Sequence, residues 1–355
     1  MKRDIFVFAG QSNMMGAAVF PPKRELHINN SYEYKHKAKR LGRGDLFVKA
    51  GYPAGEFSYI DLKAAYAEDM TDENGNSKLA DYINNTYFCP AMSNLKSEGT
   101  KELFTFSSFS ESTALDGATL APFLAEEWEK LGGSCAYAHI AKGGVSIDYY
   151  LTDKMIRENG LDIPQRNRIS GAPEYFFEKC RDLFFDAEKR FLNDEISEKC
   201  FFWFQGESDA NCVPSEYKRK LSIIWDELKK IGFTRLFCIR IDYFGADGIS
   251  GVMRAQEDFV SCHADAYMLT RVASYLTYPG QNETDWFVTP PSAEYQNCRD
   301  SFFGYNNNHI NEKGFSLIAE RAAQNLYRVL RENKKPLLEE ENIKALCRRR
   351  EKCIT

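Results

Sequence analysis

Short apolar segments alternate with longer amphipathic segments along much of this chain, and this alternation constrains the fold more than any other feature. The apolar segments have the length of strands and are bounded by glycine or polar residues; they are residues 5–9, 135–141, 200–204, 235–243 and 266–271. Strands that are apolar on both faces are typical of a parallel sheet covered by helices on both sides. The sequence therefore predicts an α/β fold with a mostly parallel, doubly wound sheet.

The segments between the expected strands carry apolar residues at helical spacing. We expect helices over residues 120–131, 174–192, about 215–231, 255–262 and 312–331. In the last of these, Phe315, Ile318, Ala322 and Leu326 follow the three- and four-residue spacing of a stripe that faces a core.

Two regions interrupt the alternation. Residues 17–115 are rich in Asn, Gly, Tyr and charge, and residues 272–308 contain three prolines, so we expect long loops in both. Ligands of open α/β sheets bind outside the carboxyl ends of the strands, where such loops would set specificity. We expect one domain over residues 1–335, with a loop-rich insertion at 17–115, and a charged tail over 336–355 that forms a peripheral helix.

The composition excludes several classes of protein. A net charge of -5 argues against binding to nucleic acid, which usually needs a basic surface. No apolar run approaches the roughly 18 residues that span a bilayer, so no membrane partner is expected. The ten cysteines are scattered and no secretion signal is recognisable at the N-terminus, which favours reduced thiols and a cytoplasmic protein. Neither a metal-ligand spacing nor a phosphate-binding glycine motif is present, so no metal and no cofactor are expected.

Polar and glycine residues follow the first two expected strands. Ser12 comes directly after the first strand, where the start of a helix offers backbone N–H groups to an anion. Gly143 and Gly144 follow the second strand, and adjacent glycines let backbone N–H groups approach a ligand closely. Taken singly, Ser12 could be a helix cap and the two glycines an ordinary turn.

The third strand and the last helix add further polar groups. Gln205, Glu207 and Asp209 follow the third strand; Gln205 could donate to an oxyanion, while the two carboxylates could hold loops or orient a base. His309 precedes the last helix in a polar loop and is a candidate general base. Alternatively, the three polar residues after the third strand could cap the helix that follows, and His309 could be an ordinary surface histidine. Together these residues supply the nucleophile, the N–H donors and the base that acyl transfer requires, at one edge of the sheet.

These segments resemble the sequence blocks of the sialate O-acetylesterase-like carbohydrate esterases, which belong to the SGNH hydrolase superfamily. The matching segments occur in the family's order over nearly the whole chain; they are Gly10-Gln11-Ser12-Asn13-Met14, Lys142-Gly143-Gly144-Val145-Ser146-Ile147, Trp203-Phe204-Gln205-Gly206-Glu207-Ser208-Asp209, Arg254-Ala255-Gln256 and His309. The first and third segments are highly specific, and the others are supportive.

The resemblance implies a three-layer α/β/α, flavodoxin-like fold with long active-site loops, and hydrolysis of an acetyl ester on a carbohydrate such as a plant polysaccharide or a sialic acid. It implies Ser12 as the nucleophile and His309 as the base. The oxyanion hole would consist of the backbone N–H groups of Ser12 and of Gly143 or Gly144, with the Gln205 amide.

One position departs from the family pattern. The family usually has an aspartate three residues before the histidine, where this chain has Asn306. An asparagine can accept a hydrogen bond but brings no charge to stabilise an imidazolium. Three explanations stay open: Asn306 orients a working Ser-His pair, another carboxylate such as Glu207 substitutes for the aspartate, or the chain is a weak or inactive relative.

Two other functions remain as alternatives to an acetylesterase. A catalytically weak or inactive carbohydrate-binding relative of the same fold is favoured by Asn306. A lipase or thioesterase would need a deep apolar acyl pocket, whereas the polar residues of the 17–115 insertion favour a sugar-facing site. The sequence does not indicate an oligomeric state.

Overall fold

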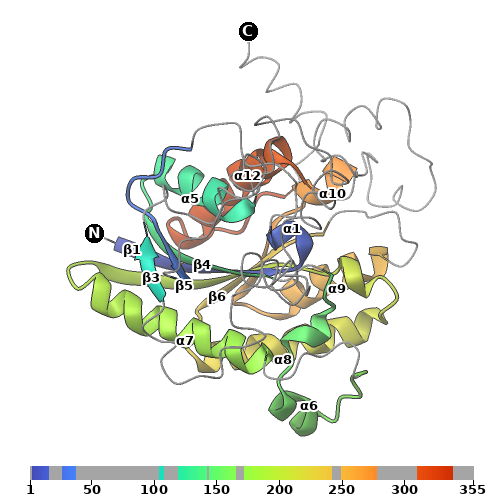
Figure 1. The fold of residues 1–355 in the computed structure, drawn as a ribbon. Coiled ribbons are helices and arrows are strands. Elements are labelled where there is room, and N and C mark those ends of the chain that lie inside the picture. The colour runs from blue at the N-terminus through green and yellow to red at the C-terminus, as the bar shows by residue number, and fades with distance from the viewer. Residues whose placement is uncertain are drawn as a thin grey trace, which may run out of the picture.

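The computed structural model describes residues 2–15, 26–36, 104–107, 119–141, 144–164, 172–241, 249–277 and 310–338. Its helices and strands form three layers, with the sheet between two layers of helices (Figure 1). The α/β/α class expected from the sequence is therefore confirmed.

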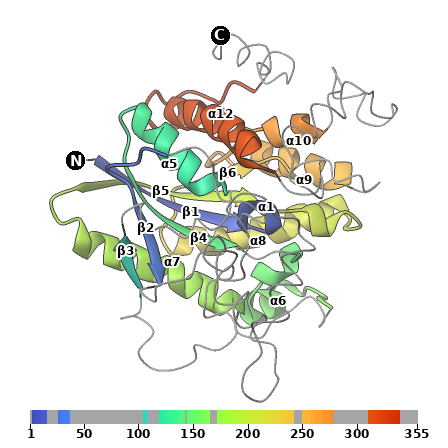
Figure 2. The same ribbon diagram turned by 45° about the horizontal axis from the view of Figure 1, so that its top comes forward.

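The sheet has seven strands in the order β3-β2-β4-β1-β5-β6-β7. Their bounds are β1 (Lys2–Gly10), β2 (Tyr32–His36), β3 (Phe104–Ser107), β4 (Cys135–Ala141), β5 (Glu195–Phe204), β6 (Arg235–Ile239) and β7 (Ala266–Thr270). All neighbouring pairs are parallel except β2 with β3. The order β4-β1-β5-β6-β7 is the 2-1-3-4-5 order of the flavodoxin-like fold. Figure 2 shows β2 and β3 at the edge of the sheet beside β4.

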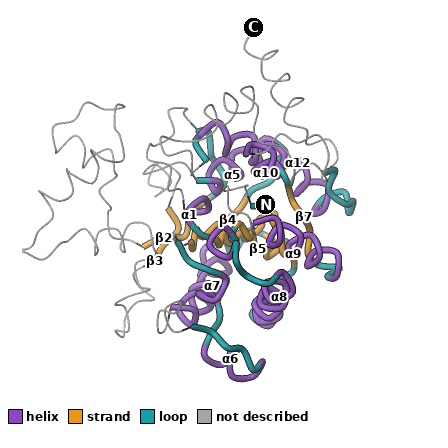
Figure 3. Tube along the Cα trace, turned by 90° about the vertical axis from the view of Figure 1, so that its right-hand side faces the viewer, coloured by secondary structure: helices purple, strands orange, loops and turns teal. Residues whose placement is uncertain are grey.

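Helices cover both faces of this sheet, as the end-on view shows (Figure 3). One face carries α5 (Leu120–Lys130) and α12 (Glu312–Leu330), with α10 (Val272–Thr277) beside α12. The other face carries α7 (Ala172–Arg190) and α8 (Pro214–Lys230), with α9 (Ile249–Cys262) packed against α8. The shorter helical segments are α1 (Ser12–Met15), η4 (Ile147–Tyr150), α6 (Asp153–Asn159) and η6 (Glu207–Asp209).

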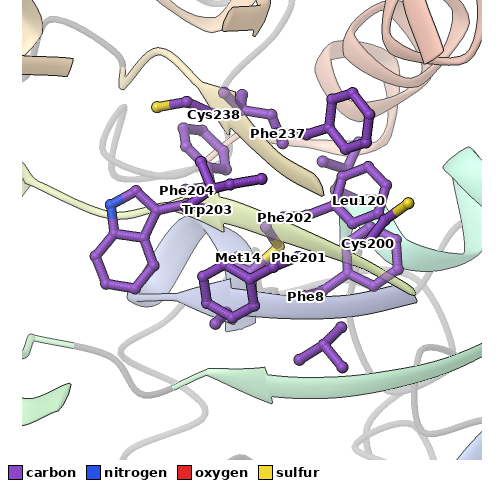
Figure 4. Close-up of a cluster of buried hydrophobic side chains, with 14 of the residues drawn as sticks. Phe8, Met14, Leu120, Cys200, Phe201, Phe202, Trp203, Phe204, Phe237 and Cys238 are labelled. Atoms are coloured by element: carbon purple, nitrogen blue, oxygen red, sulfur yellow. The ribbon is translucent and has the colours of Figure 1, made fainter. Parts of the chain in front are cut away.

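A row of aromatic rings crosses four adjacent strands at paired positions. Phe8 of β1 pairs with Phe202 of β5, which pairs with Phe237 of β6, which pairs with Tyr267 of β7. The successive ring centroids lie 4.7, 5.4 and 5.7 Å apart, and each pair of rings is stacked. Figure 4 labels Phe8, Phe202 and Phe237 of this row. Such pairs stabilise a sheet beyond the burial of their area. Because these four strands are parallel, their carboxyl ends meet at one edge of the sheet.

The structure corrects the expected loops in two places. β2 and β3 lie within residues 17–115, and α10 lies within residues 272–308. β2 and β3 alternate aromatic with polar residues, as edge strands do, and lack the continuous apolar run of the inner strands. The other described part of these two regions, residues 26–31, contains no helix or strand, and the remainder lies outside the described residues.

Other bounds differ by a few residues. β1 and β5 begin earlier than expected, β6 ends at Ile239 rather than at residue 243, and α9 begins at Ile249 rather than at residue 255. The tail does not continue as a helix over residues 332–338, and the peripheral helix expected beyond them falls outside the described residues. No helix in the described part of the chain is long and apolar enough to cross a membrane.

Candidate functional site

The chain leaves β1 and β5 toward opposite faces of the sheet. β4, reached from β1 through α5, lies on one side of β1, while β6, reached from β5 through α8 on the other face, lies on the opposite side. Open α/β sheets bind ligands outside the carboxyl ends of strands at such a switch point. Ser12 follows β1 there, and residues 205–209 follow β5. The edge that the sequence predicts for the site is therefore the switch point of the sheet.

The turn that carries Ser12 depends on close contact between β1 and β5. A Cβ atom on Gly10 would lie 1.9 Å from the carbonyl oxygen of Phe204, so no other residue fits without movement of the backbone. The hydroxyl of Tyr150 accepts a hydrogen bond from the Gly10 N–H at 3.0 Å and donates to the Gly10 carbonyl at 2.6 Å. Burial raises the pKa of Tyr150, which keeps the hydroxyl neutral and able to do both. These contacts leave the Ser12 side chain partly exposed at the end of the strand.

The short helix α1 that begins with Ser12 is held at its other end by the layer of α5. The Thr119 hydroxyl donates to the Met14 carbonyl at 2.8 Å, and Nε2 of His139 also contacts that oxygen. His139 ends up next to α1 because it pairs with Phe8 in the sheet. Both ends of the Ser12 turn are thus attached to the core.

Gln205 is fully buried at the end of β5 and forms the centre of a polar network. Its Nε2 donates to Oδ2 of Asp209 at 2.5 Å, to the Val145 carbonyl at 3.1 Å and to Oε1 of Gln11 at 3.4 Å. Its Oε1 accepts from the Tyr217 hydroxyl at 3.0 Å. In this arrangement the amide holds three segments together, and donation to an oxyanion would require it to exchange a protein partner.

Asp209 links the end of β5 to the loop that follows β4. Its Oδ2 also accepts from the Ile147 N–H at 2.9 Å. Burial raises the pKa of Asp209 to about 7, against the opposing effect of hydrogen bonds from Gln205 and Ile147. In the same loop Gly144 is exposed and has a φ of 69°, a conformation that favours glycine. The loop with the predicted N–H donors is therefore tied to the turn after β5.

The side chain of Asn13 joins the Ser12 turn to two distant parts of the chain. Its Nδ2 donates to Oε1 of Glu207 at 3.0 Å. Its Oδ1 accepts from the backbone N–H of Ile310 at 3.0 Å. Gln11, on the other side of Ser12, accepts from the backbone N–H of Ser208 at 3.1 Å through its Oε1. The residues that flank Ser12 are therefore bonded to the turn after β5 and to the start of α12.

Five of the site residues expected from the sequence belong to the described part of the chain: Ser12, Gly144, Gln205, Glu207 and Asp209. The turns that carry Ser12, Gln205 and Glu207 are in direct hydrogen-bond contact, and Gly144 lies in the loop that Asp209 and Gln205 hold. Gly143, Asn306 and His309 lie outside the described residues.

Sequence reasoning missed three residues that support this site. Tyr150 and Tyr217 carry hydroxyls that bind the ends of β1 and β5, and Asn13 connects the turns. Tyr217 lies on the apolar stripe of α8, and a buried hydroxyl needs a hydrogen-bond partner. That requirement could have marked Tyr217, from the sequence alone, as part of a buried polar network. Gln256 of the Arg-Ala-Gln segment also belongs here, since its Nε2 donates to the Gln205 carbonyl at 2.8 Å.

Within the described ranges, no group of three His, Cys, Asp or Glu residues is placed to hold a metal ion. The groups that the site presents are a hydroxyl, backbone N–H groups and hydrogen-bonded polar side chains.

No protein-family model and no curated protein sequence matches the chain. Among solved structures, it is similar to a carbohydrate acetylesterase from Xanthomonas citri, with 10% identity and a TM-score of 0.44 over 93% of this chain and 57% of that one. The chain thus spans little more than half of the Xanthomonas protein. It is also similar to a protein from Arabidopsis thaliana, with 14% identity and a TM-score of 0.42 over 91% of this chain and 97% of that one. A third similar structure is NanS, with 12% identity and a TM-score of 0.45 over 93% of this chain and 98% of that one.

Proposed function

We propose that this chain is a serine esterase that removes O-acetyl groups from a carbohydrate, with Ser12 as nucleophile and His309 as general base. The observation that carries the proposal is the hydrogen bond from the Ile310 N–H to Oδ1 of Asn13. It joins the residue after His309 to the residue after Ser12, although 297 positions separate Asn13 from Ile310. A nucleophile and its base must come within hydrogen-bond reach of each other, and this bond supports that pairing.

The proposed reaction has two steps. His309 takes the proton of the Ser12 hydroxyl while the Ser12 oxygen attacks the acetyl carbonyl, and the carbonyl electrons move onto the oxygen as a tetrahedral oxyanion. The sugar oxygen leaves with the proton that His309 returns. Water then attacks the acetyl-serine with His309 again as base, which releases acetate and restores Ser12.

The backbone N–H groups of Ser12 and of Gly143 or Gly144 stabilise the oxyanion in this proposal. We assign Gln205 a supporting role, because its Nε2 already donates to Asp209, Val145 and Gln11. By holding those three segments it keeps the Ser12 turn and the glycine loop at fixed positions, which is what electrostatic stabilisation of a transition state requires.

The choice of an acetylated carbohydrate as substrate rests on the sequence blocks around Ser12 and Gln205. The polar insertion at residues 17–115 agrees with it, since a sugar is recognised mainly by hydrogen-bonding side chains.

Replacement of the nucleophile tests the reaction. We expect Ser12→Ala to lower kcat/KM for p-nitrophenyl acetate by at least about 10³-fold, because no other hydroxyl in the mechanism forms the acyl-enzyme. Ser208→Ala is the matched control: Ser208 is exposed at the same sheet edge and uses its backbone N–H, not its hydroxyl, to bind Gln11. Equal hydrolysis by Ser12→Ala and wild-type protein would exclude Ser12 as the nucleophile.

The substrate class is tested by acetate release from acetylated xylan, acetylated mannan and O-acetylated sialic acid, each with Ser12→Ala as the blank. We expect release from at least one of these carbohydrates that depends on Ser12. Hydrolysis of long-chain acyl esters in preference to all of them would favour the lipase or thioesterase alternative.

A carbohydrate-binding protein without esterase activity is the second candidate function, and Asn306 favours it because asparagine supplies no charge to a histidine base. This function predicts heat of binding with an acetylated sugar in calorimetry, no burst of p-nitrophenol, and no labelling of Ser12 by a serine-reactive phosphonate. Labelling of Ser12 in the wild type would reject it.

A further inference from the structure

Three separate parts of the chain meet at one buried side chain beside Ser12. Asn13 is 1% exposed and belongs to the turn after β1. It is bonded to Glu207, in the turn after β5, and to Ile310, which precedes the N-cap residue of α12. Asn13 therefore holds the two turns of the switch point and the segment that leads into α12.

The chemistry of its partners fixes the orientation of the Asn13 amide. An ionised carboxylate only accepts hydrogen bonds, so the Glu207 carboxylate requires the NH₂ group of Asn13 on its side. A backbone N–H only donates, so Ile310 requires the amide oxygen on the other side. Only one of the two amide orientations satisfies both partners.

The start of α12 is held by this bond and by its own cap. Oδ1 of Asn311, the N-cap residue, accepts from the N–H groups of Lys313 at 2.9 Å and of Gly314 at 3.2 Å. Those bonds fix the first turn of the helix to itself, whereas the bond from Ile310 to Asn13 fixes it relative to the Ser12 turn. Ile310 is fully buried, so its N–H needs such a partner.

We propose that Asn13 and Glu207 form a positioning pair that sets the distance between the Ser12 turn and the segment carrying His309. The inference rests on the proposed function. The nitrogen that Asn13 binds belongs to the peptide bond between residues 309 and 310, so a shift of that nitrogen moves the backbone of the proposed base. Glu207 acts in this pair by orienting Asn13, and the pair gives this chain a means of placing its base that does not require a carboxylate at residue 306.

The test exchanges donor and acceptor between the two members of the pair. In Asn13→Asp the residue still accepts from Ile310 but no longer donates to Glu207, and two carboxylates face each other. We expect kcat for p-nitrophenyl acetate to fall about 10²-fold near neutral pH, the loss typical of a small misplacement of a catalytic group, with KM changed by less than about threefold. The double variant Asn13→Asp/Glu207→Gln restores one donor and one acceptor in swapped places, and we expect it to recover to within about fivefold of wild type.

The pH profile separates positioning from a loss of fold. When two carboxyl groups share a site, the pKa of one is raised. Below that pKa the protonated carboxyl donates to the other and remakes the bond; above it both are ionised and repel. The ratio of kcat in Asn13→Asp to kcat in wild type should therefore fall as pH rises, whereas the ratio for the double variant should stay flat. Thermal unfolding followed by circular dichroism verifies that each variant is folded at the assay temperature.

Two results overturn the inference alone: wild-type kcat in Asn13→Asp at every pH, or a double variant no more active than the single one, in a protein whose hydrolysis depends on Ser12. Absence of Ser12-dependent hydrolysis in the wild type overturns the proposed function and, with it, this inference. The Ser12→Ala blank in the same assay separates these outcomes.

Discussion

Asp209 is a buried carboxyl group, and both its ionised and its neutral state carry a free-energy cost. Ionised, it accepts two hydrogen bonds at Oδ2 but loses its hydration; neutral, it loses the electrostatic part of those bonds. Burial has the larger effect and raises the pKa of Asp209 to about 7, with Lys220 opposing and Asp148 adding to the rise. Its titration therefore falls close to neutral pH rather than in the acid range.

This raised pKa predicts how stability depends on pH. The folded protein binds the Asp209 proton more tightly than the unfolded chain, so this contribution to stability is complete below the unfolded pKa of about 4 and is lost as pH rises through about 7. We expect the free energy of unfolding to fall in that window by at most about 1.4 kcal/mol per pH unit from this one group.

Asp209→Asn resembles the protonated acid and should remove that slope. Urea unfolding from about pH 4 to about pH 8 should show the variant close to wild type at the acid end and more stable than wild type at the alkaline end. Asp226→Asn, at an exposed aspartate of α8 paired with Lys229, should change stability by less than about 0.5 kcal/mol. Curves for wild type and Asp209→Asn that run parallel across the range would contradict the raised pKa.

The part played by single residues was only partly visible in the sequence. Ser12, Gln205 and Glu207 stand out because polar residues that follow apolar strands need a reason to be there. The hydrogen-bond partners of Gln205 did not follow from that reasoning. Its amide binds the Tyr217 hydroxyl and the Val145 carbonyl, which come from the apolar stripe of a helix and from a loop. A residue type indicates what a side chain can do, and its neighbours in space decide which of those roles it takes.

At the scale of elements, one buried charge joins β1 to the helix layer above it. Asp4 of β1 is fully buried, and its Oδ2 accepts from Nε1 of Trp128 on α5 at 3.1 Å and from the Arg331 guanidinium at the end of α12 at 2.5 Å. Arg331 also lies over the Trp128 ring, 4.9 Å from its centroid. Burial raises the pKa of Asp4 although Arg331 lowers it, so the ion pair offsets only part of the cost of burying the carboxylate.

Removal of Arg331 should therefore weaken the attachment of α12. We expect Arg331→Met to lower the free energy of unfolding by about 3 kcal/mol, because it leaves the Asp4 carboxylate buried without its cation. Arg328→Met, on the same helix, removes a partly exposed pair with Glu332 and an exposed hydrogen bond to the Lys335 carbonyl, and it should cost less than about 1 kcal/mol.

Addition of Asp4→Asn to Arg331→Met should recover part of the loss, since it removes the uncompensated charge. The measurement is a double-mutant cycle by urea unfolding. A double variant that loses the sum of the two single losses would show that Asp4 and Arg331 are not coupled.

The ion pair between Asp4 and Arg331 also explains why the start of β1 could not be predicted from the sequence. β4 matches its expected bounds because nearly all of its residues are apolar and buried. β1 begins at Lys2 rather than at Ile5, since Arg3 is paired with Asp194 and Asp4 with Arg331, and neither partner is near in sequence. In a sequence, a charged residue predicts the end of a buried strand, unless the distant residue that pairs with it is known. β2 and β3 escaped notice for a different reason: edge strands need no continuous apolar run.

At the scale of the whole molecule, the position of the candidate site follows from topology. β1 and β5 are parallel, and the connections that follow them run in opposite directions along the sheet. This topology brings the residues after both strands to one edge, and the sequence predicts this much once the strands are recognised. It does not predict that Ile310 donates to Asn13, because nothing in either segment specifies a partner 297 positions away. The fold class and the sheet edge of the site were thus open to prediction, and the bonds that assemble the site were not.

Stability should be graded across the sheet in the same way as burial. β1 and β5 have a hydrogen-bonded strand on each side and nearly continuous buried residues at their carboxyl halves, whereas β3 and β7 are the two edges. Amides that open only with global unfolding exchange at rates set by the full free energy of unfolding, while edge amides open locally.

We therefore expect hydrogen exchange measured by mass spectrometry to be slowest in peptides covering residues 5–9 and 200–204, and faster in those covering residues 104–107 and 266–270. Low concentrations of urea should accelerate exchange in the central peptides and leave the edge peptides almost unchanged, because only global opening exposes much new surface. Central peptides that exchanged as fast as the edges, or that did not respond to urea, would mean that the stacked rings of β1, β5 and β6 do not form a cooperative core beneath the site.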